Sequence, residues 1–259
     1  IATVRLTWIG LFFNSFLPGA VTGDLVKLLY ARDLDRNLSK TFLLTSVVMD
    51  RILGLIGLLG VLGFFSILSY GKLTEISPQV THLVHFNFLL FFGAMSFLGL
   101  IFLPHEGQRP FLKFAKMIPF LGEKIHHTLE QVWLIGSNKK VVVKGVLISF
   151  ASQVTNVFAM WIVSYPFITG QLDLSLTFSF IPLGFLTVAI PISPSGLGVG
   201  HVAFATLFGY FGIKEGASLF NLYFLSLIFV NSLGLIPYLI GGKKHSLEEA
   251  SEEFEEVAS

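Results

Sequence analysis

Four long apolar runs constrain this chain more than any other feature of its sequence. They lie at about residues 41–69, 82–103, 140–167 and 217–240. Each approaches or exceeds the roughly 20 residues that an α-helix needs to cross a bilayer. The chain is 53% hydrophobic and 13% charged, and this charged share is well below that of a soluble domain. The sequence therefore predicts an all-α fold, a polytopic helical membrane bundle.

Two further apolar segments are interrupted by proline and glycine. The first covers about residues 3–30 and contains Leu17-Pro-Gly-Ala-Val-Thr-Gly-Asp-Leu-Val-Lys27. The second begins at about residue 174 and ends in Pro191-Ile-Ser-Pro-Ser-Gly-Leu-Gly-Val-Gly-His201. Breaks are tolerated at membrane depth only inside protein or beside a polar cavity, so we expect broken or re-entrant helices. For the first break, the alternative is a loop at the membrane surface.

The two breaks resemble each other in sequence. In each, a Pro-containing, Gly-rich turn precedes a short apolar helix, and the pairs Gly23-Asp24 and Gly200-His201 occupy matching places. Matching breaks in two halves of a chain indicate an inverted repeat around a transport site. The alternative is chance similarity between two glycine-rich turns.

Among the charged side chains of these apolar segments are Asp24, Lys27, Asp50 and Arg51. Ionisable groups at membrane depth are costly, and they are usually paired or functional. Adjacent residues on a helix do not face each other, so Asp50 and Arg51 each need a partner on another segment. We expect Asp24 to form a salt bridge with Arg51. Two interpretations stay open, a structural ion pair and a site for an anionic ligand.

The glycine-rich turn before His201 is a second candidate for ligand contact. Pro194, Gly196 and Gly198 disfavour a helix and leave backbone N–H groups exposed ahead of the next one. Such N–H groups bind anions, whereas small residues also permit a close helix crossing. His201 is interpreted either as part of this site or as a packed core imidazole.

Residues 109–137 differ in kind from the apolar runs. Beyond residue 121, the apolar side chains that share one helical face are Ile125, Leu129, Val132 and Trp133. We therefore expect a cytoplasmic-side interfacial helix in 109–137, with residues 121–133 parallel to the membrane surface. Its apolar face would contact lipid or the bundle.

The basic residues predict the topology. Lysine and arginine gather in residues 27–40, 109–144 and 243–244, so these parts are expected to face the cytoplasm. The result is a multi-pass protein of the cytoplasmic membrane, with a transmembrane domain over residues 1–245. Residues 246–259 form an acidic, flexible tail on the cytoplasmic side. Because the chain begins at an apolar Ile1 without methionine, we expect N-terminal helices to be missing.

Several functional classes find no support in the composition. The formal net charge is +1, so no electrostatic case for a nucleic-acid partner exists. The chain has no cysteine, and its histidines have no companions at metal-ligand spacing, so neither a metal nor a cofactor is expected. No nucleotide-binding or catalytic-triad motif is present, and an enzyme is the less favoured interpretation.

Three motifs in chain order carry a resemblance to a known family. They are Phe13-Asn-Ser-Phe-Leu-Pro-Gly-Ala-Val-Thr-Gly-Asp-Leu-Val-Lys27, Asp50-Arg51 and Pro194-Ser-Gly-Leu-Gly-Val-Gly200. Together they resemble the lysylphosphatidylglycerol synthase transmembrane-domain family over nearly the whole chain, without the family's first helices. The resemblance implies a helical bundle with re-entrant elements that handles or flips lipid in the cytoplasmic membrane.

The resemblance also implies site residues. The positions that carry over are Asn14, Pro18, Gly23, Asp24, Lys27, Asp50, Arg51, Pro194, Gly196 and Gly198. Many family members have glutamate where this chain has His201, so the role of a carboxylate there does not carry over. Members that make aminoacylated lipids add a large soluble catalytic domain, and the resemblance does not imply that activity for this chain.

These features predict a lipid-binding membrane protein, a flippase-like translocator of an anionic or phosphate-bearing lipid. The headgroup phosphate is expected on Lys27, Arg51 and the backbone of residues 194–200, with Asp24 aligning a cation. One alternative is an intramembrane lipid-modifying transferase that uses Asp24 or Asp50 as general base. Another is a membrane scaffold for a separate enzyme. The expected partners are membrane lipids, and a homo-oligomer or a partner enzyme stays open.

Overall fold

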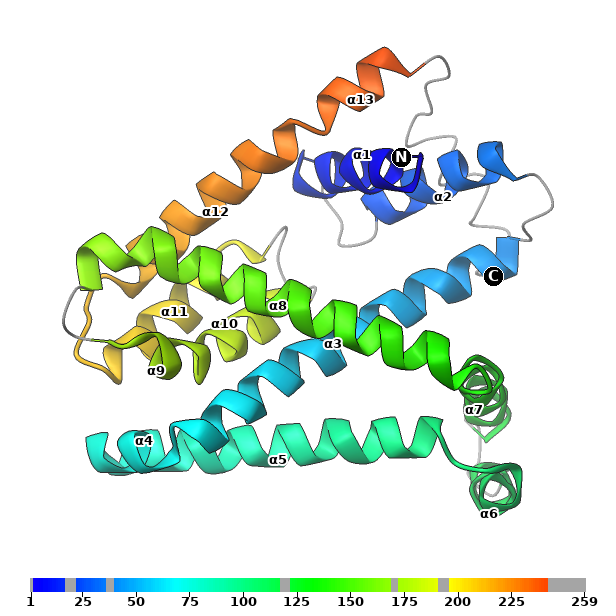
Figure 1. Cartoon of the computed structure of the whole chain (residues 1–259), viewed down its shortest axis with the longest axis horizontal. Coiled ribbons are helices and arrows are strands. Elements are labelled where there is room, and N and C mark those ends of the chain that lie inside the picture. Colours follow the sequence, from blue (N-terminus) through cyan, green and yellow to red (C-terminus); the bar gives the residue numbers. More distant parts are fainter. Residues whose placement is uncertain are drawn as a thin grey trace. The chain divides into compact units, whose positions relative to one another are not determined.

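The computed structural model describes residues 2–16, 22–35, 40–116, 122–168, 172–190 and 196–241 (Figure 1). These residues contain helices and no strand, which confirms the predicted all-α class. The helices are α1 (Ala2–Phe16), α2 (Thr22–Leu34), α3 (Lys40–Leu68), α4 (Tyr70–Ile76), α5 (Pro78–Ile101), α6 (His105–Lys116), α7 (Gly122–Gly136), α8 (Lys139–Ile168), α9 (Leu174–Phe178), α10 (Ile181–Ala189), α11 (Val199–Gly209), α12 (Gly216–Ser232) and α13 (Leu235–Ile240).

Within the described residues, four stretches are long and apolar enough to cross a membrane, judged by length and composition. They are Thr45–Leu68, Pro78–Ile101, Lys139–Ile168 and Gly216–Ile240, the last of which combines α12 and α13. Each overlaps one of the four apolar runs of the sequence. The chain is therefore a helical membrane protein, as its sequence predicts.

The chain divides into two compact units. The terminal unit comprises residues 1–52 and 157–259, and the central unit comprises residues 53–156, so α3 and α8 contribute to both. In the terminal unit, α1 packs against α2, and a buried apolar cluster forms around them. Its buried members are Ile9, Val26, Leu28, Leu29, Tyr30, Leu43 and Val47.

Aromatic rings dominate the rest of the terminal unit, where α10, α11 and α12 pack together. Phe204 of α11 stacks on Phe220 of α12, with ring centroids 5.0 Å apart. A Cβ atom at Gly184 would collide with the ring of Phe204, and one at Gly200 would collide with the ring of Phe220. At both places a phenylalanine ring of one helix packs against a glycine of another. Small residues permit such close packing between membrane helices.

In the central unit, α3 packs closely against α8 at a glycine and is hydrogen-bonded to α5 by buried polar side chains. A Cβ atom at Gly57 would lie 2.7 Å from the carbonyl carbon of Ser149, so α3 and α8 cross closely there. The Asn87 side-chain amide donates a hydrogen bond to Ser66 Oγ over 3.0 Å, and both residues are fully buried. Such interhelical hydrogen bonds hold polar groups that would otherwise be unsatisfied in an apolar surrounding.

Two segments differ from the sequence-based expectation. Residues 71–78 contain glycine and polar side chains typical of a turn, but most of them belong to α4. Ser77 is extended and starts α5 by accepting a hydrogen bond from the Val80 N–H. The single crossing expected at residues 174–190 is divided into α9 and α10. Pro182 explains the division, since proline is tolerated at the start of a helix and not in its interior.

Other expectations are met in part or lie outside the described residues. Residues 109–137 are shared between α6 and α7, and α7 coincides with the predicted amphipathic stretch. Trp133 of α7 is buried and donates from Nε1 to the Leu100 carbonyl of α5 over 2.8 Å, so it faces the protein. The acidic tail at residues 246–259 lies outside the described residues.

Candidate functional site

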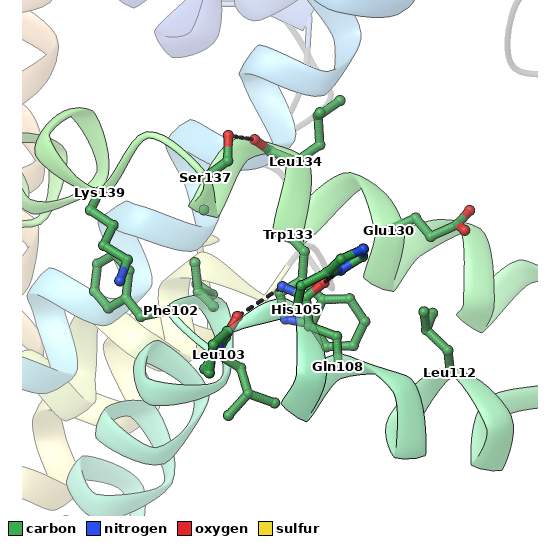
Figure 2. A pocket seen from close by; sticks show the side chains of 13 residues that line it. Phe102, Leu103, His105, Gln108, Leu112, Glu130, Trp133, Leu134, Ser137 and Lys139 are labelled. Atoms are coloured by element: carbon green, nitrogen blue, oxygen red, sulfur yellow. Dashed lines mark hydrogen bonds between the residues drawn. The ribbon is translucent and has the colours of Figure 1, made fainter.

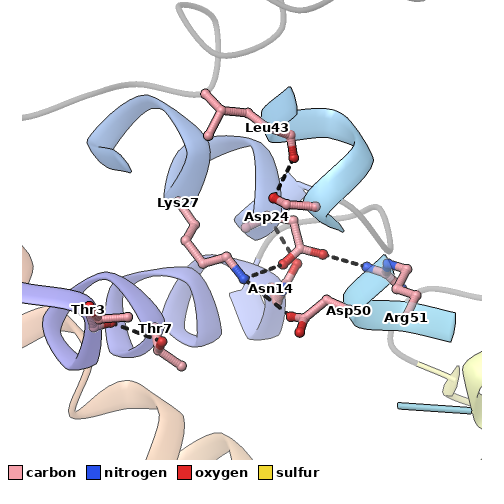
Figure 3. Close-up of polar contacts among 10 residues, drawn as sticks. Thr3, Thr7, Asn14, Asp24, Lys27, Leu43, Asp50 and Arg51 are labelled. Atoms are coloured by element: carbon pink, nitrogen blue, oxygen red, sulfur yellow. Dashed lines mark hydrogen bonds and ion pairs between the residues drawn. The ribbon is translucent and has the colours of Figure 1, made fainter. Parts of the chain in front are cut away.

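The predicted salt bridge between Asp24 and Arg51 is present in the terminal unit (Figure 3). Arg51 Nη2 donates to Asp24 Oδ2 over 2.7 Å. Lys27 Nζ lies 3.6 Å from the other Asp24 oxygen, Oδ1, and 3.7 Å from Asp50 Oδ2. We call Asp24, Lys27, Asp50 and Arg51 the charged cluster. Its two carboxylates and two cations make it formally neutral.

The spacing of the four residues explains this arrangement. Asp24 and Lys27 are three residues apart on α2 and therefore lie on the same face of that helix. Asp50 and Arg51 are neighbours on α3 and reach different residues of α2, Lys27 and Asp24 respectively. The expectation that each has its partner on another segment is confirmed, and the two ion pairs hold α2 to α3.

Exposure is graded across the charged cluster. The Asp24 side chain is 16% exposed and Lys27 27%, whereas Arg51 is 47% and Asp50 77% exposed. Asp24 is thus the enclosed member, held between two cations. Both cations keep exposed surface that a further anion can reach. Asp50 is the carboxylate that an incoming anion would displace at the lowest cost, since its ion pair is long and the side chain is already solvated.

Asn14 forms the link between α1 and the start of α2. Its Oδ1 accepts a hydrogen bond from the Gly23 N–H over 2.9 Å. The crossing is so close that a Cβ atom at Gly23 would collide with the Gly10 carbonyl oxygen and lie 2.6 Å from the Asn14 nitrogen. Asn14 therefore satisfies one of the unpaired N–H groups at the N-terminus of α2, although it belongs to a different helix. This contact agrees with its interpretation as an interhelical hydrogen-bond partner.

Asn14→Ala is expected to lower the free energy of unfolding by about 1 kcal/mol, the typical value of a side-chain cap at a helix N-terminus. Asn14→Asp should retain most of the stability, because a carboxylate accepts the same bond and suits the positive end of α2. Thermal unfolding of the detergent-purified protein measures the difference. Equal melting temperatures for the wild type and Asn14→Ala would show that the bond contributes nothing.

The second break has a different set of contacts. Gly196 and Gly198 have φ angles of 72° and 84°, a region that glycine adopts without strain. The Gly198 N–H donates to His201 Nδ1 over 3.3 Å, and the His201 ring meets the Phe220 ring edge-on with centroids 5.1 Å apart. A histidine at the third position of α11 thus takes the place of the acidic or amide side chain of a capping box.

The candidate residues therefore fall into two groups. The first contains Asn14, Gly23 and the charged cluster, which contact one another across α1, α2 and α3. The second consists of Gly196, Gly198 and His201. Its contacts are with Val188 of α10 and Phe220 of α12. Pro18 and Pro194 lie outside the described residues.

The two breaks correspond in position. Gly23 is the second residue of α2, and Gly200 is the second residue of α11. At both places a glycine allows a close approach, by the α1 backbone in one case and by the Phe220 ring in the other. One N–H group near the start of each following helix is bonded to a protein side chain, Asn14 for α2 and His201 for α11. This leaves fewer N–H groups for an anion than the glycine-rich sequence suggests.

A comparison of the sequence with known families assigns the chain. The family model described as the lysylphosphatidylglycerol synthase TM region matches residues 1–234. The chain belongs to this family. The match includes both breaks and the charged cluster, and it identifies the chain as a lipid-related membrane protein. Neither a curated protein nor a solved structure matches the chain significantly.

Proposed function

We propose that this member of the lysylphosphatidylglycerol synthase TM-region family translocates an anionic or phosphate-bearing lipid across the cytoplasmic membrane. The observation that carries the proposal is the charged cluster, which combines an enclosed Asp24 with two cations that keep exposed surface. A purely structural ion pair does not require that both cations keep exposed surface. Charges at a helix break in a membrane protein commonly mark a ligand path.

The headgroup phosphate binds by displacing the Asp50 carboxylate from Lys27. In the state described here, Lys27 lies against Asp50 at 3.7 Å, and Asp50 is mostly exposed. A phosphate that replaces Asp50 meets the Lys27 ammonium and approaches the half-exposed Arg51 guanidinium. Arg51 suits this role because its planar fork matches phosphate oxygens. Asp24 keeps Arg51 oriented from the enclosed side.

The acyl chains stay in the bilayer beside the helix surface. Phe16 and Val48, which lie on the same helices as the first site group, are 51% and 56% exposed. Exposed apolar side chains of this kind are the normal surface of a protein that faces lipid. The proposed topology places the basic residues 27–40 and 109–144 and the C-terminal tail on the cytoplasmic side.

Purified protein reconstituted in vesicles with a fluorescent phospholipid tests the proposal. Dithionite added outside bleaches only the fluorophore in the outer leaflet, which is about half of the total in protein-free vesicles. If the protein exchanges lipid between the leaflets, a larger fraction is bleached. We expect Lys27→Gln to slow this exchange about tenfold, the loss of one charge-assisted hydrogen bond in a partly desolvated site. Lys214→Gln, which removes an exposed lysine from a turn, is the matched control.

The same vesicles separate translocation from the two alternatives. Mass spectrometry of the recovered lipid detects a transferase, because a modified headgroup changes mass. A scaffold leaves the lipid both unmodified and unexchanged. Wild-type protein that neither bleaches beyond the protein-free level nor alters the lipid contradicts the proposed function.

A further inference from the structure

The central unit contains a cavity that is separate in sequence from the charged cluster (Figure 2). It has a volume of about 600 Å³, within the usual range for small-ligand pockets. It lies where four helix ends meet: the end of α5, the start of α6, the end of α7 and the start of α8. The side chains that the argument uses are His105, Gln108, Glu130, Trp133, Leu134 and Lys139.

The position of these helix ends places the cavity at the level of lipid headgroups. The stretches Pro78–Ile101 and Lys139–Ile168 are both long and apolar enough to cross a bilayer. The cavity is bordered by the last residue of the first and the first residue of the second. A cavity at the ends of two membrane-crossing helices lies in the interfacial region, about 15 Å from the bilayer centre.

Trp133 supplies a fixed apolar wall. It is 5% exposed, and its Nε1 donates to the Leu100 carbonyl, which holds the indole ring of α7 against α5. Leu134 follows it with 74% exposure, so apolar surface continues from the cavity to the outside. Tryptophan prefers the membrane interface, where its ring meets the glycerol region of lipids.

One side of the cavity can accept a phosphate. Gln108 Nε2 donates to the Leu103 carbonyl over 2.8 Å, which turns its Oε1 toward His105 Nδ1 at 3.1 Å. Because Oε1 can only accept, Nδ1 donates to it, and Nε2 can donate to a phosphate only in the imidazolium form, in which both ring nitrogens carry a proton. The Lys139 side chain lines the same cavity, and Figure 2 shows it on the side opposite Glu130.

The other side of the cavity can accept an amine. Glu130 is 49% exposed and lies 3.5 Å from His126 Nδ1, one turn earlier on α7. Glu130 therefore combines solvent access with a place in the lining of the cavity. A carboxylate and an ammonium on opposite sides of one interfacial cavity are complementary to a ligand that carries both charges.

We propose that this cavity binds the headgroup of a zwitterionic phospholipid with a primary amine, as in phosphatidylethanolamine. Lys139 contacts the phosphate, and the imidazolium form of His105 donates to it from Nε2. Glu130 contacts the ammonium, and Trp133 packs on the glycerol and the first acyl carbons. This site is distinct from the charged cluster and does not depend on the proposed translocation. It adds a bound lipid to the surface of the central unit.

Native mass spectrometry of the detergent-purified protein tests the proposal by counting retained lipids. Phosphatidylethanolamine and phosphatidylglycerol are titrated separately, because the second shares the phosphate and lacks the amine. We expect Lys139→Gln and Glu130→Gln each to weaken retention of one phosphatidylethanolamine about 5- to 10-fold. Lys140→Gln and Glu123→Gln remove exposed charges of the same helices outside the cavity and should bind like the wild type.

Two results would overturn the proposal. The first is retention of phosphatidylethanolamine that is equal in the two cavity variants and the two control variants. The second is equal retention of both lipids with sensitivity to Lys139→Gln alone, which would mean that the cavity recognises phosphate without the amine. Arg51→Ala should leave this binding unchanged, since a lipid lost with Arg51 belongs to the charged cluster. All four charge variants replace exposed side chains, so a melting curve suffices to show that they fold.

Discussion

Gly23→Ala is expected to destabilise the protein by about 3 kcal/mol or more, at the upper end of the range for overpacking substitutions. A methyl group at this position collides with the Gly10 carbonyl oxygen and lies 2.6 Å from the Asn14 nitrogen. Both obstacles are backbone atoms of α1, so no side-chain rotation relieves the contact. The helices must separate, and the hydrogen bond from the Gly23 N–H to Asn14 is lost with them.

The matched control is Gly93→Ala in α5. Nothing lies within 4 Å of a Cβ atom at Gly93, and the residue is exposed. Alanine is a better helix former than glycine, so this variant should be as stable as the wild type or slightly more stable. Thermal unfolding in detergent compares the two. If Gly23→Ala melts within about 1 °C of Gly93→Ala, a shift far below that expected for 3 kcal/mol, the close crossing of α1 and α2 is not present in the protein.

Arg51→Ala is expected to abolish lipid exchange in the vesicle assay while the protein still reaches the membrane. The substitution removes the cation that combines exposed surface with a bidentate fork, and it leaves the enclosed Asp24 with Lys27 as its remaining partner among the charged cluster. Arg51→Lys should recover part of the activity, because an ammonium supplies the charge without the planar geometry. Gel filtration in detergent reports whether each variant is folded.

Asp24→Asn should have a different effect from Arg51→Ala. Asp24 orients Arg51 and does not contact the lipid in the proposed mechanism, so its replacement should slow exchange without abolishing it. His201→Gln is expected to be milder still, because glutamine at the third position of α11 can accept the Gly198 N–H as histidine does. An Asp24→Asn variant that is as inactive as Arg51→Ala would place Asp24 in direct contact with the ligand.

The charged cluster could be predicted from sequence, because an unpaired charge in an apolar segment is energetically costly and few pairings avoid it. Asp24, Lys27, Asp50 and Arg51 lie in apolar segments and need partners, and adjacent residues on α3 cannot pair with each other. The pairing of Asp24 with Arg51 follows directly. The additional contact of Lys27 with Asp50 requires the register between α2 and α3, which the sequence does not specify.

Local features with competing signals were harder to predict. Residues 70–76 contain glycine and polar residues typical of a turn, but they form α4 and bury Leu73. In the stretch 174–190 no charged residue marks the boundary between α9 and α10, although Pro182 indicates where a new helix can start. The cavity at Trp133 could not be predicted, because it arises where the ends of four helices meet, and the sequence does not show how those ends pack.

The central claim is that Arg51 contacts the lipid and is more than the partner of Asp24. The double variant Asp24→Asn/Arg51→Gln tests it most directly, because it replaces the ion pair by two neutral polar side chains and leaves Lys27 paired with Asp50. In the vesicle assay we expect the double variant to fold like the wild type and to exchange lipid no faster than Arg51→Ala. Exchange at the wild-type rate by the double variant would show that the pair is structural and would contradict the claim.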